Sequence, residues 1–300
     1  MSELYIRYEY WLAFFQLLFA MVGMGATLKL ADFFAVAQAP NAFIVGLLTQ
    51  VVGVPLVAWG ILHALNVEPG VAIGLAILAA IPGGSTSNIF THIARANVPL
   101  SIALSAVTTA FCLVTVPLVL KALISDYVPL GFELPAGKIA AEILITLLMP
   151  LAVGMAILHY LPKVAEPLSR WAVRLSLAII VVMVVGAGLA GRLDWKAFGV
   201  DNALLVCGFA IGLAIIGFVV PKLLGLKLAD EAAINIELSV RNVNLGVLIK
   251  ASLFPATAAT AAAAALGNMA FFAMLVYAVV MMVLAAILIA LTRYRARINT

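Results

Sequence analysis

Two stretches of the sequence place polar residues inside runs that are otherwise apolar. The first is Pro82-Gly83-Gly84-Ser85-Thr86-Ser87-Asn88. The second lies between residues 235 and 244, and its polar members are Asn235, Glu237, Ser239, Arg241, Asn242 and Asn244. Proline and glycine interrupt helices, and hydroxyl, amide, carboxylate and unwound backbone oxygens are suitable ligands for Na⁺. Both stretches therefore predict a pocket in which oxygen atoms surround a cation.

A third group of polar residues lies between these two stretches. Ser101 and Ser105 are four residues apart and share one helical face, which Thr108, Cys112 and Thr115 continue. Hydroxyl groups in membrane helices also pack helices together, and for this stripe alone that alternative stays open. Glu237 is the only carboxylate expected near the middle of its run, and it would supply the negative charge that a buried cation needs.

The composition shows where such a pocket must lie. Hydrophobic residues make up 66% of the 300 residues and charged residues only 10%, which excludes an ordinary soluble fold. Apolar runs long enough to cross a bilayer predict an all-α membrane protein with about nine transmembrane helices. The runs fall near residues 8–28, 41–65, 71–94, 98–124, 139–160, 173–191, 203–226, 232–254 and 259–292.

Other features narrow the function classes. The sequence has no phosphate-binding loop, nucleophile elbow or HExxH motif, so we expect neither an ATP-driven pump nor an enzyme. Cys112 and Cys207 lie in apolar runs and predict neither a disulfide nor a metal site. The N-terminal residues lack the features of a cleaved signal, so the first run is interpreted as a mature helix. Glu142, four residues after Lys138, is interpreted as part of an exposed helical ion pair.

The distribution of basic residues predicts the orientation. A cytoplasmic C-terminus places ten Lys and Arg residues inside and six outside, in agreement with the positive-inside rule, and nine spans then put the N-terminus outside. The scatter of these residues over loops gives no sign of a nucleic-acid partner.

A weak internal match predicts an inverted repeat within one membrane domain, residues 1–300. Residues 64–67 lead into Ala72-Ile73 much as residues 225–228 lead into Ala233-Ile234, with a spacing of 161. The halves would cover residues 8–124 and 139–292. Interrupted helices at corresponding positions of inverted halves point to a binding site near the membrane midplane.

Three segments carry a resemblance to a known family: Gly23-Met24-Gly25-Ala26-Thr27-Leu28, Pro82 to Asn88, and Glu237-Leu238-Ser239-Val240-Arg241-Asn242. In order and spacing they resemble the signature stretches of the bile acid:sodium symporter family, and the similarity covers nearly the whole chain. It implies a panel domain, a core domain in which two discontinuous helices cross, and a rocking or elevator-like motion between the domains.

The resemblance also implies binding residues. The family's first sodium site maps to Ser87, Asn88, Ser101, Ser105 and Glu237. Its second sodium site maps to Gln50, Glu237, the carbonyls of residues 238 and 240, and a position that is usually Gln but here is Arg241. Because an arginine side chain has no acceptor atom, it cannot bind Na⁺, and Gln50 would be the remnant of that site. The family's substrate contacts map to Ser85, Asn242 and Asn268, with Gly267 where a His is usual.

We therefore expect a symporter of the inner (plasma) membrane that moves a small organic anion, bile acid-like or a small carboxylate, together with Na⁺. The positive charge of Arg241 predicts one Na⁺ per cycle, because it already supplies the charge of a second ion; Arg241 binding the substrate carboxylate, or pairing with Glu237 only structurally, are the alternatives. Sodium-independent or proton-coupled transport and a membrane-embedded ligand sensor also stay open. Besides the anion, Na⁺ and the bilayer, the sequence indicates no obligate protein partner.

Overall fold

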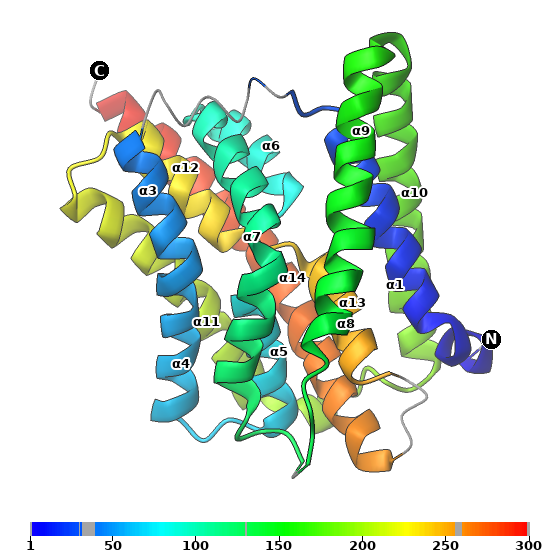
Figure 1. The fold of residues 1–300 in the computed structure, drawn as a ribbon. Coiled ribbons are helices and arrows are strands. Elements are labelled where there is room, and N and C mark those ends of the chain that lie inside the picture. Colours follow the sequence, from blue (N-terminus) through cyan, green and yellow to red (C-terminus); the bar gives the residue numbers. More distant parts are fainter. Residues whose placement is uncertain (1, 30, 32–39, 130, 256–259, 299–300) are drawn as a thin grey trace.

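Most of the described part of the chain is helical (Figure 1). The computed structural model describes residues 2–29, 31, 40–129, 131–255 and 260–298, and it leaves out the side chains of residues 2–4 and 85. Where the connections between the helices are fully described, they are short loops. In chain order the helices are α1 (Ser2–Gly25), α3 (Pro40–Leu48), η2 (Thr49–Gly53), α4 (Val54–Ala64), α5 (Pro69–Ala80), α6 (Ser85–Ala94), α7 (Val98–Ile124), α8 (Ala136–Ile143), η3 (Leu144–Leu148), α9 (Met149–Tyr160), α10 (Pro162–Leu189), α11 (Trp195–Leu223), α12 (Leu228–Ser239), α13 (Val243–Leu253) and α14 (Ala261–Ile298).

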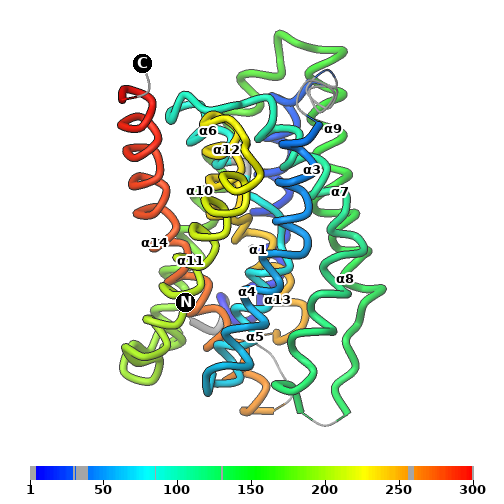
Figure 2. Tube along the Cα trace, turned by 90° about the vertical axis from the view of Figure 1, so that its left-hand side faces the viewer, coloured from blue at the N-terminus to red at the C-terminus, as the bar shows by residue number. Residues whose placement is uncertain are grey.

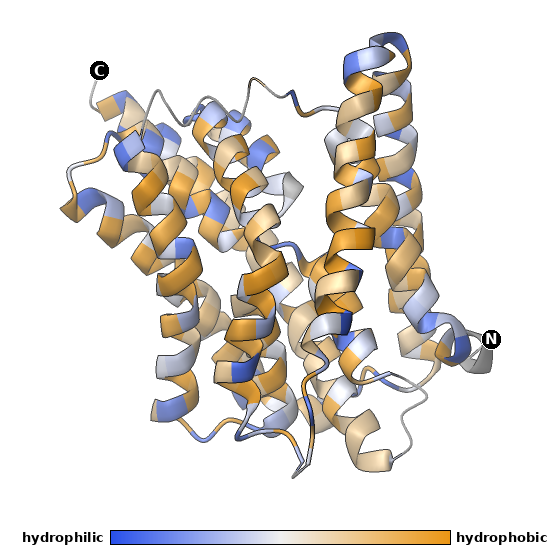
Figure 3. Ribbon diagram, viewed as in Figure 1, coloured by the Kyte–Doolittle hydropathy of each residue, from blue (hydrophilic) through white to orange (hydrophobic). Residues whose placement is uncertain are grey.

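Six of these helical stretches are long and apolar enough to cross a bilayer. They are Pro40–Ala64, Val98–Ile124, Ala136–Tyr160, Pro162–Leu189, Trp195–Leu223 and Ala261–Ile298. Hydrophobic residues cover most of the helix lengths, and many hydrophilic ones gather near the two ends of the molecule (Figure 3). The predicted all-α polytopic membrane fold is confirmed. With α1 and the pairs α5–α6 and α12–α13 the described helices could supply nine crossings, and that count stays a prediction.

Several predicted spans end where their charged residues begin, whereas the helices continue. α10 begins at Pro162 rather than near residue 173, and α14 extends to Ile298 rather than to residue 292. Charged side chains limit the apolar run but do not oppose helix formation, and a proline fits the first helical turn, where its missing N–H is not needed.

Two of the long helices contain a wide π-helical turn. The turns are η2 (Thr49–Gly53) and η3 (Leu144–Leu148), and a proline, Pro55 or Pro150, follows each by two residues. A proline within a helix cannot donate to the carbonyl four residues earlier and its ring collides with that carbonyl, so the turn before it widens. The first of these turns contains Gln50.

Both predicted helix breaks are present. α5 ends at Ala80, and Ile81 is extended because the residue before a proline disfavours the helical conformation. α6 then begins at Ser85. In the second pair α12 ends at Ser239, and Asn242 caps the start of α13 by accepting a hydrogen bond from the Leu245 N–H at 3.3 Å.

The two broken helices run in opposite directions. α5 and α13 lie toward one end of the molecule and α6 and α12 toward the other (Figures 1 and 2). Both α5 and α12 have 12 residues. Ala72 is the fourth residue of α5 and Ala233 the sixth of α12, so the helix starts differ by two residues from the register of the sequence match. This arrangement is consistent with an inverted repeat, which stays a prediction.

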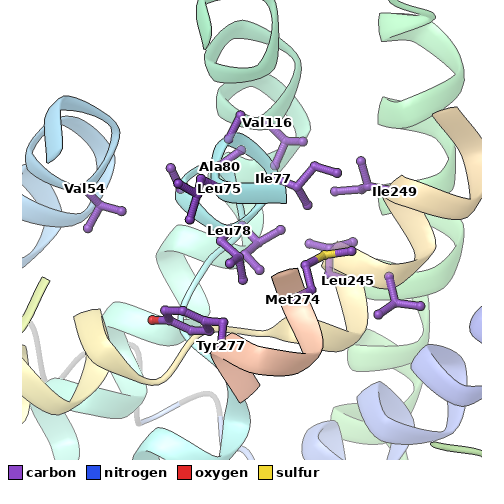
Figure 4. Packing of buried hydrophobic residues seen from close by; sticks show 14 of the residues in the cluster. Val54, Leu75, Ile77, Leu78, Ala80, Val116, Leu245, Ile249, Met274 and Tyr277 are labelled. Atoms are coloured by element: carbon purple, nitrogen blue, oxygen red, sulfur yellow. The ribbon is translucent and has the colours of Figure 1, made fainter. Parts of the chain in front are cut away.

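The helices form two packing groups. α1, α9 and α10 pack against one another, and α8 and η3 continue α9; the other group comprises the helices α3 to α7 and α11 to α14. In Figure 1 the first group stands on the right. Within the second group α5 is enclosed, since every residue from Gly70 to Ala80 is buried. Leu75, Ile77 and Leu78 pack there with Met274 and Tyr277 of α14 (Figure 4).

Candidate functional site

The two helix breaks meet and pair with each other. Gly83 and Arg241 form an antiparallel bridge, in which the Gly84 N–H donates to the Val240 carbonyl at 2.7 Å and the Asn242 N–H donates to the Pro82 carbonyl at 2.9 Å. The backbone groups freed by the breaks thus satisfy one another, as non-helical backbone at membrane depth requires. This crossing lies inside the second helix group, and the buried residues Glu237 and Arg241 lie beside it.

Glu237, in the last turn of α12, is completely buried beside the crossing. Its two carboxylate oxygens accept hydrogen bonds from three serine hydroxyls. Ser87 donates to Oε2 at 2.5 Å, Ser101 donates to Oε2 at 3.2 Å, and Ser105 donates to Oε1 at 2.6 Å. The described residues place no basic side chain within 4.0 Å of this carboxyl group, so the hydrogen-bond partners that they supply to it are serine hydroxyl groups.

Asn88 completes this cluster. Its Oδ1 accepts hydrogen bonds from Ser101 at 2.8 Å and from Ser105 at 3.4 Å. Thr91, which is not among the predicted site residues, donates to the Ser101 hydroxyl at 3.2 Å. All five residues proposed for the first sodium site are therefore neighbours, although they come from the helices α6, α7 and α12. Helical spacing could have identified Thr91, because it lies four residues after Ser87 on the same helix.

A glycine makes the approach of Glu237 to the crossing possible. A Cβ atom at Gly83 would collide with the Glu237 carboxylate, whose Oε1 and Cδ would be its nearest neighbours. Any side chain at this position would have to displace the carboxylate from the serines. Gly83 is thus required by close packing rather than by an unusual backbone conformation.

Arg241 is also buried, with 2% of its surface exposed. Its guanidinium donates to the carbonyls of Leu78 at 3.2 Å and Ala79 at 3.3 Å and to that of Ile81, which are the free carbonyls at the C-terminal end of α5. Among the described residues no ion pair within 4.0 Å joins it to Glu237. The cation therefore lies against the negative end of a half-helix dipole.

Gln50 lies near Arg241. A small cavity of about 10 Å³ has both residues in its lining, with Thr108 and Cys112 of α7. Gln50 donates to the Thr108 hydroxyl at 3.3 Å, while its own Oε1 has no hydrogen-bond partner, nor has Nη1 of Arg241. A cavity of this size has room for about one water molecule. The structure thus brings together Gln50, the remnant of the expected second cation site, and Arg241, which stands where a Gln is usual.

A larger cavity of about 410 Å³ lies between the two helix groups, and residues of the crossing form part of its lining. Its polar part comprises Gln16 of α1, Gly84 and Thr86 at the start of α6, Arg241, and Asn242 and Asn244 at the start of α13. The rest is apolar and is contributed mainly by α10 and α14: Leu177, Ile180, Met183, Val184, Leu275, Met281 and Met282. Ser85 is the first residue of α6, and its side chain lies outside the described part of the chain.

Asn268, the third predicted substrate contact, is not brought to this cavity. It lies on α14 and accepts a hydrogen bond from Arg192 Nε at 2.5 Å, and both residues line a separate cavity of about 300 Å³. Arg192 also donates to Glu9 at 2.9 Å, as does Lys250 at 2.9 Å. No local sequence pattern marks this buried cluster, because α1, the loop after α10, α13 and α14 contribute one residue each.

The interpretation of Glu142 as an exposed residue was wrong. It lies 3.9 Å from Lys138, as its spacing predicted, but it is buried and accepts hydrogen bonds from Tyr10 at 2.9 Å and Ser252 at 3.0 Å. Helical spacing shows which neighbours a residue has on its own helix and not which other helices cover it. Here α1 and α13 pack over α8.

Known proteins resemble the chain over most of its length. It is 29% identical over 239 residues to the "Uncharacterized sodium-dependent transporter YocS" of Bacillus subtilis, covering 78% of this chain and 72% of that one. It is 29% identical to the "Probable sodium/metabolite cotransporter BASS1, chloroplastic" of Arabidopsis thaliana, covering 78% of this chain and 57% of the plant protein.

A human relative, the "Ileal sodium/bile acid cotransporter", is 24% identical over 241 residues, which cover 78% of this chain and 68% of the human protein. The model of one family, described as the Sodium Bile acid symporter family, matches residues 14–190, more than half of the chain. Together with the crossing of two broken helices beside a buried carboxylate, this match shows that the chain belongs to the sodium bile acid symporter family.

Proposed function

We propose that this protein is a secondary transporter that moves a small organic anion together with Na⁺, by exposing one binding region alternately to the two sides of a membrane. The observation that carries the proposal is the Glu237 carboxylate, completely buried and surrounded by Ser87, Ser101 and Ser105, with no basic side chain of the described residues within 4.0 Å. The sodium-dependent relatives support the same coupling ion.

The chemistry of the cluster suits a small monovalent cation. Each serine hydroxyl has lone pairs besides the hydrogen that it now donates, and Asn88 adds an amide oxygen. A cation among these oxygens would neutralise the carboxylate, whose burial in an ion-free site is costly. The cluster consists of oxygen donors, with no imidazole or thiol, and such hard ligands fit an alkali ion better than a transition metal.

The proposed anion site is the larger cavity beside the crossing. The N-termini of α6 and α13 both lie at this cavity, and free N–H groups at helix N-termini attract a carboxylate. Its apolar walls would contact the rest of the substrate. We infer a monocarboxylate with an apolar body, which Asn242, Asn244 and Thr86 would orient, with Ser85 as a predicted contact.

We further propose one Na⁺ per transport cycle, because Arg241 is a cation fixed to the protein. It binds the C-terminal carbonyls of α5, groups of the kind that hold Na⁺ in transporters with broken helices. The charges of Glu237 and Arg241 cancel in the empty site, and those of one Na⁺ and one monoanion cancel in the loaded site. A site that stays neutral in both states avoids the cost of a net charge within the membrane.

Arg241 as a direct substrate ligand is the alternative that one observation favours. It is among the residues that line the larger cavity, and Nη1 has no hydrogen-bond partner. A carboxylate could accept a hydrogen bond from this nitrogen. Loss of anion affinity without a change in the number of Na⁺ ions bound, on replacing Arg241, would favour this role.

The proposed location is a cell inner (plasma) membrane, with the N-terminus outside and the C-terminus in the cytoplasm, as the distribution of basic residues predicts. The anion, Na⁺ and the bilayer would be its partners. If Na⁺ proved unnecessary, the alternatives would be transport driven by protons or by the anion gradient alone, or ligand sensing without transport.

Uptake of radiolabelled carboxylates into proteoliposomes tests the proposal. With an inward Na⁺ gradient we expect accumulation, and with K⁺ in place of Na⁺ we expect uptake to fall to the level of protein-free liposomes. Uptake that follows an imposed pH gradient and ignores Na⁺ would establish proton coupling instead. Binding of a carboxylate without flux under any gradient would show that the protein is a ligand sensor rather than a transporter.

A further inference from the structure

Buried polar contacts join the two helix groups at one end of the molecule. Glu9 of α1 accepts a hydrogen bond from Lys250 of α13 at 2.9 Å, with both side chains almost completely buried. Glu142 of α8 accepts one from Ser252, also of α13, at 3.0 Å. Figures 1 and 2 both place α8 and α13 away from the end where α14 terminates.

Arg192, in the loop after α10, strengthens the same junction. Its Nη1 donates to Glu9 at 2.9 Å and its Nε donates to Asn268 of α14 at 2.5 Å, so its guanidinium contacts both groups. Tyr10 of α1 donates to Glu142 at 2.9 Å and holds that carboxylate toward α13.

The packing of the helices follows the same division. α8 and η3 pack against α7, and α8 also packs against α13, so this half of the α8–α9 helix is attached to the second group. The α9 half packs mainly against α1, η3 and α10, all of the first group. The groups are therefore fastened at the end that contains Glu9 and Glu142.

The chemistry of these contacts suits a junction that opens and closes. A buried ion pair contributes little net stability, because its attraction is offset by the hydration that both ions lost. When the groups separate, water can hydrate both ions again. In addition, the second oxygens of Glu9 and Glu142 are buried without hydrogen-bond partners, and water would satisfy them on opening. If apolar surfaces formed the junction instead, opening it would expose them to water at the full cost of the hydrophobic effect.

One helix connects this junction to the crossing. α13 begins beside Asn242, where the two breaks pair, and Lys250 lies eight residues further along. A helix rises 1.5 Å per residue, so about 12 Å of rigid helix separates the two. A change at the crossing can therefore be transmitted to Lys250 by movement of α13 as a unit.

We propose that Glu9, Lys250, Arg192, Glu142 and Ser252 form a lock that closes the larger cavity at this end of the molecule, and that it breaks and reforms in each transport cycle. This proposal rests on the proposed function, since it assumes that the binding region is exposed to the two sides in turn. The lock itself acts on access and takes no part in binding the transported species.

The test measures from which side a probe in the cavity can be reached. Leu177→Cys places one thiol on the α10 wall of the cavity, in a protein whose Cys112 and Cys207 are replaced by alanine. A membrane-impermeant maleimide is applied to intact cells and to inside-out vesicles. In the Glu9→Gln and Lys250→Met variants we expect the labelling rate from the lock side to rise at least about fivefold, as for a typical coupling between two conformations.

Three controls separate a lock from general stability. In the Glu9→Gln/Lys250→Met protein the labelling rate should rise no further than in Glu9→Gln alone, because Glu9→Gln already removes the ion pairs with both Lys250 and Arg192. The Lys250→Arg protein, which keeps the positive charge, should be labelled at the same rate as the parent protein. Ser169→Ala should also leave the rate unchanged, since Ser169 donates to the Gly23 carbonyl at 2.7 Å between α10 and α1, within one group. Unchanged labelling in the Glu9 and Lys250 variants, or an equal rise in Ser169→Ala, would overturn the proposal.

A second measurement leaves the ion pair intact, in case those variants do not fold. Glu142→Cys/Ser252→Cys introduces a disulfide across the junction, and its formation should abolish lock-side labelling of residue 177 until a reductant is added. Lock-side labelling that persists in the cross-linked protein would contradict the lock. Because labelling requires no transport, failure of the lock and failure of the proposed function give different results.

Discussion

At the scale of single residues, Glu237 determines the chemistry of the candidate site. Three serine hydroxyls donate to its carboxylate, and Asn88 accepts from two of the same hydroxyls, so the hydroxyl hydrogens are shared between a charged and a neutral acceptor. A cation could enter by rotation of these hydroxyls, without movement of the backbone. The affinity should therefore depend strongly on the charge and weakly on each neutral oxygen.

Asn88→Ala tests the contribution of one neutral oxygen. The loss of a single uncharged interaction costs about 0.5–1.5 kcal/mol, so the Na⁺ concentration for half-maximal uptake should rise about two- to tenfold, with the number of ions bound unchanged. A Na⁺ titration of uptake measures both quantities. An unchanged titration would show that Asn88 only packs α6 against α7.

Arg241→Gln tests the fixed positive charge. The substitution removes a cation and adds an acceptor oxygen beside the α5 carbonyls and Gln50, so we expect a second Na⁺ to bind and the Hill coefficient for Na⁺ to rise from near one to near two. Uptake should also become sensitive to voltage, because each additional charge moved gains about 2.3 kcal/mol per 100 mV. Uptake by the unmodified protein that already depends on voltage with a Hill coefficient near two would refute the one-sodium proposal.

At the scale of elements, the function depends on the crossing of the two helix breaks. Side chains donate hydrogen bonds to the free carbonyls at these breaks. Arg241 donates to those at the end of α5, and Tyr277 of α14 donates to the Ser239 carbonyl at the end of α12 at 2.9 Å. The breaks are thus fixed structures rather than loose loops, and they position Glu237 within reach of α6 and α7.

Gly83→Ala tests this positioning. Its Cβ would collide with the Glu237 carboxylate, so the carboxylate must leave the serines and Na⁺ affinity should fall by at least about tenfold, the equivalent of 1.4 kcal/mol. Gly60→Ala on α4 is the matched control, because its Cβ would meet nothing within 4 Å. Equal Na⁺ affinities of the two variants would show that the crossing can accommodate the added methyl group without displacing Glu237.

The sequence predicted the breaks well and other features poorly, for physical reasons. Proline, glycine and clustered polar residues signal a break locally, and the hydroxyl spacing on α7 follows helical periodicity. The grouping of Ser101 and Ser105 with residues 87, 88 and 237 came instead from the family resemblance. Asn268 was assigned by correspondence across a stretch where spacing changes, and it lies in a different cavity. The contacts of Arg241 with α5 carbonyls depend on tertiary structure, which no local pattern encodes.

At the scale of the whole molecule, the chain consists of two helix groups with a cavity between them and polar contacts at one end. The sequence predicted a panel and a core through family resemblance, whereas the junction of Glu9, Arg192 and Lys250 joins segments more than 50 residues apart and could not be found by periodicity. Residues of the crossing line the larger cavity, and the buried carboxylate lies beside the same crossing. Movement of one group past the other can thus act on both sites together.

The most direct test of the central claim is equilibrium binding of radiolabelled Na⁺ to the purified protein in lipid nanodiscs, which requires no knowledge of the anion. We predict saturable binding of about one ion per chain to the unmodified protein. Glu237→Gln keeps the shape of the side chain but removes the buried charge, which costs about 2–5 kcal/mol and should weaken binding at least about 30-fold. Na⁺ binding of unchanged affinity in the Glu237→Gln protein would contradict the account.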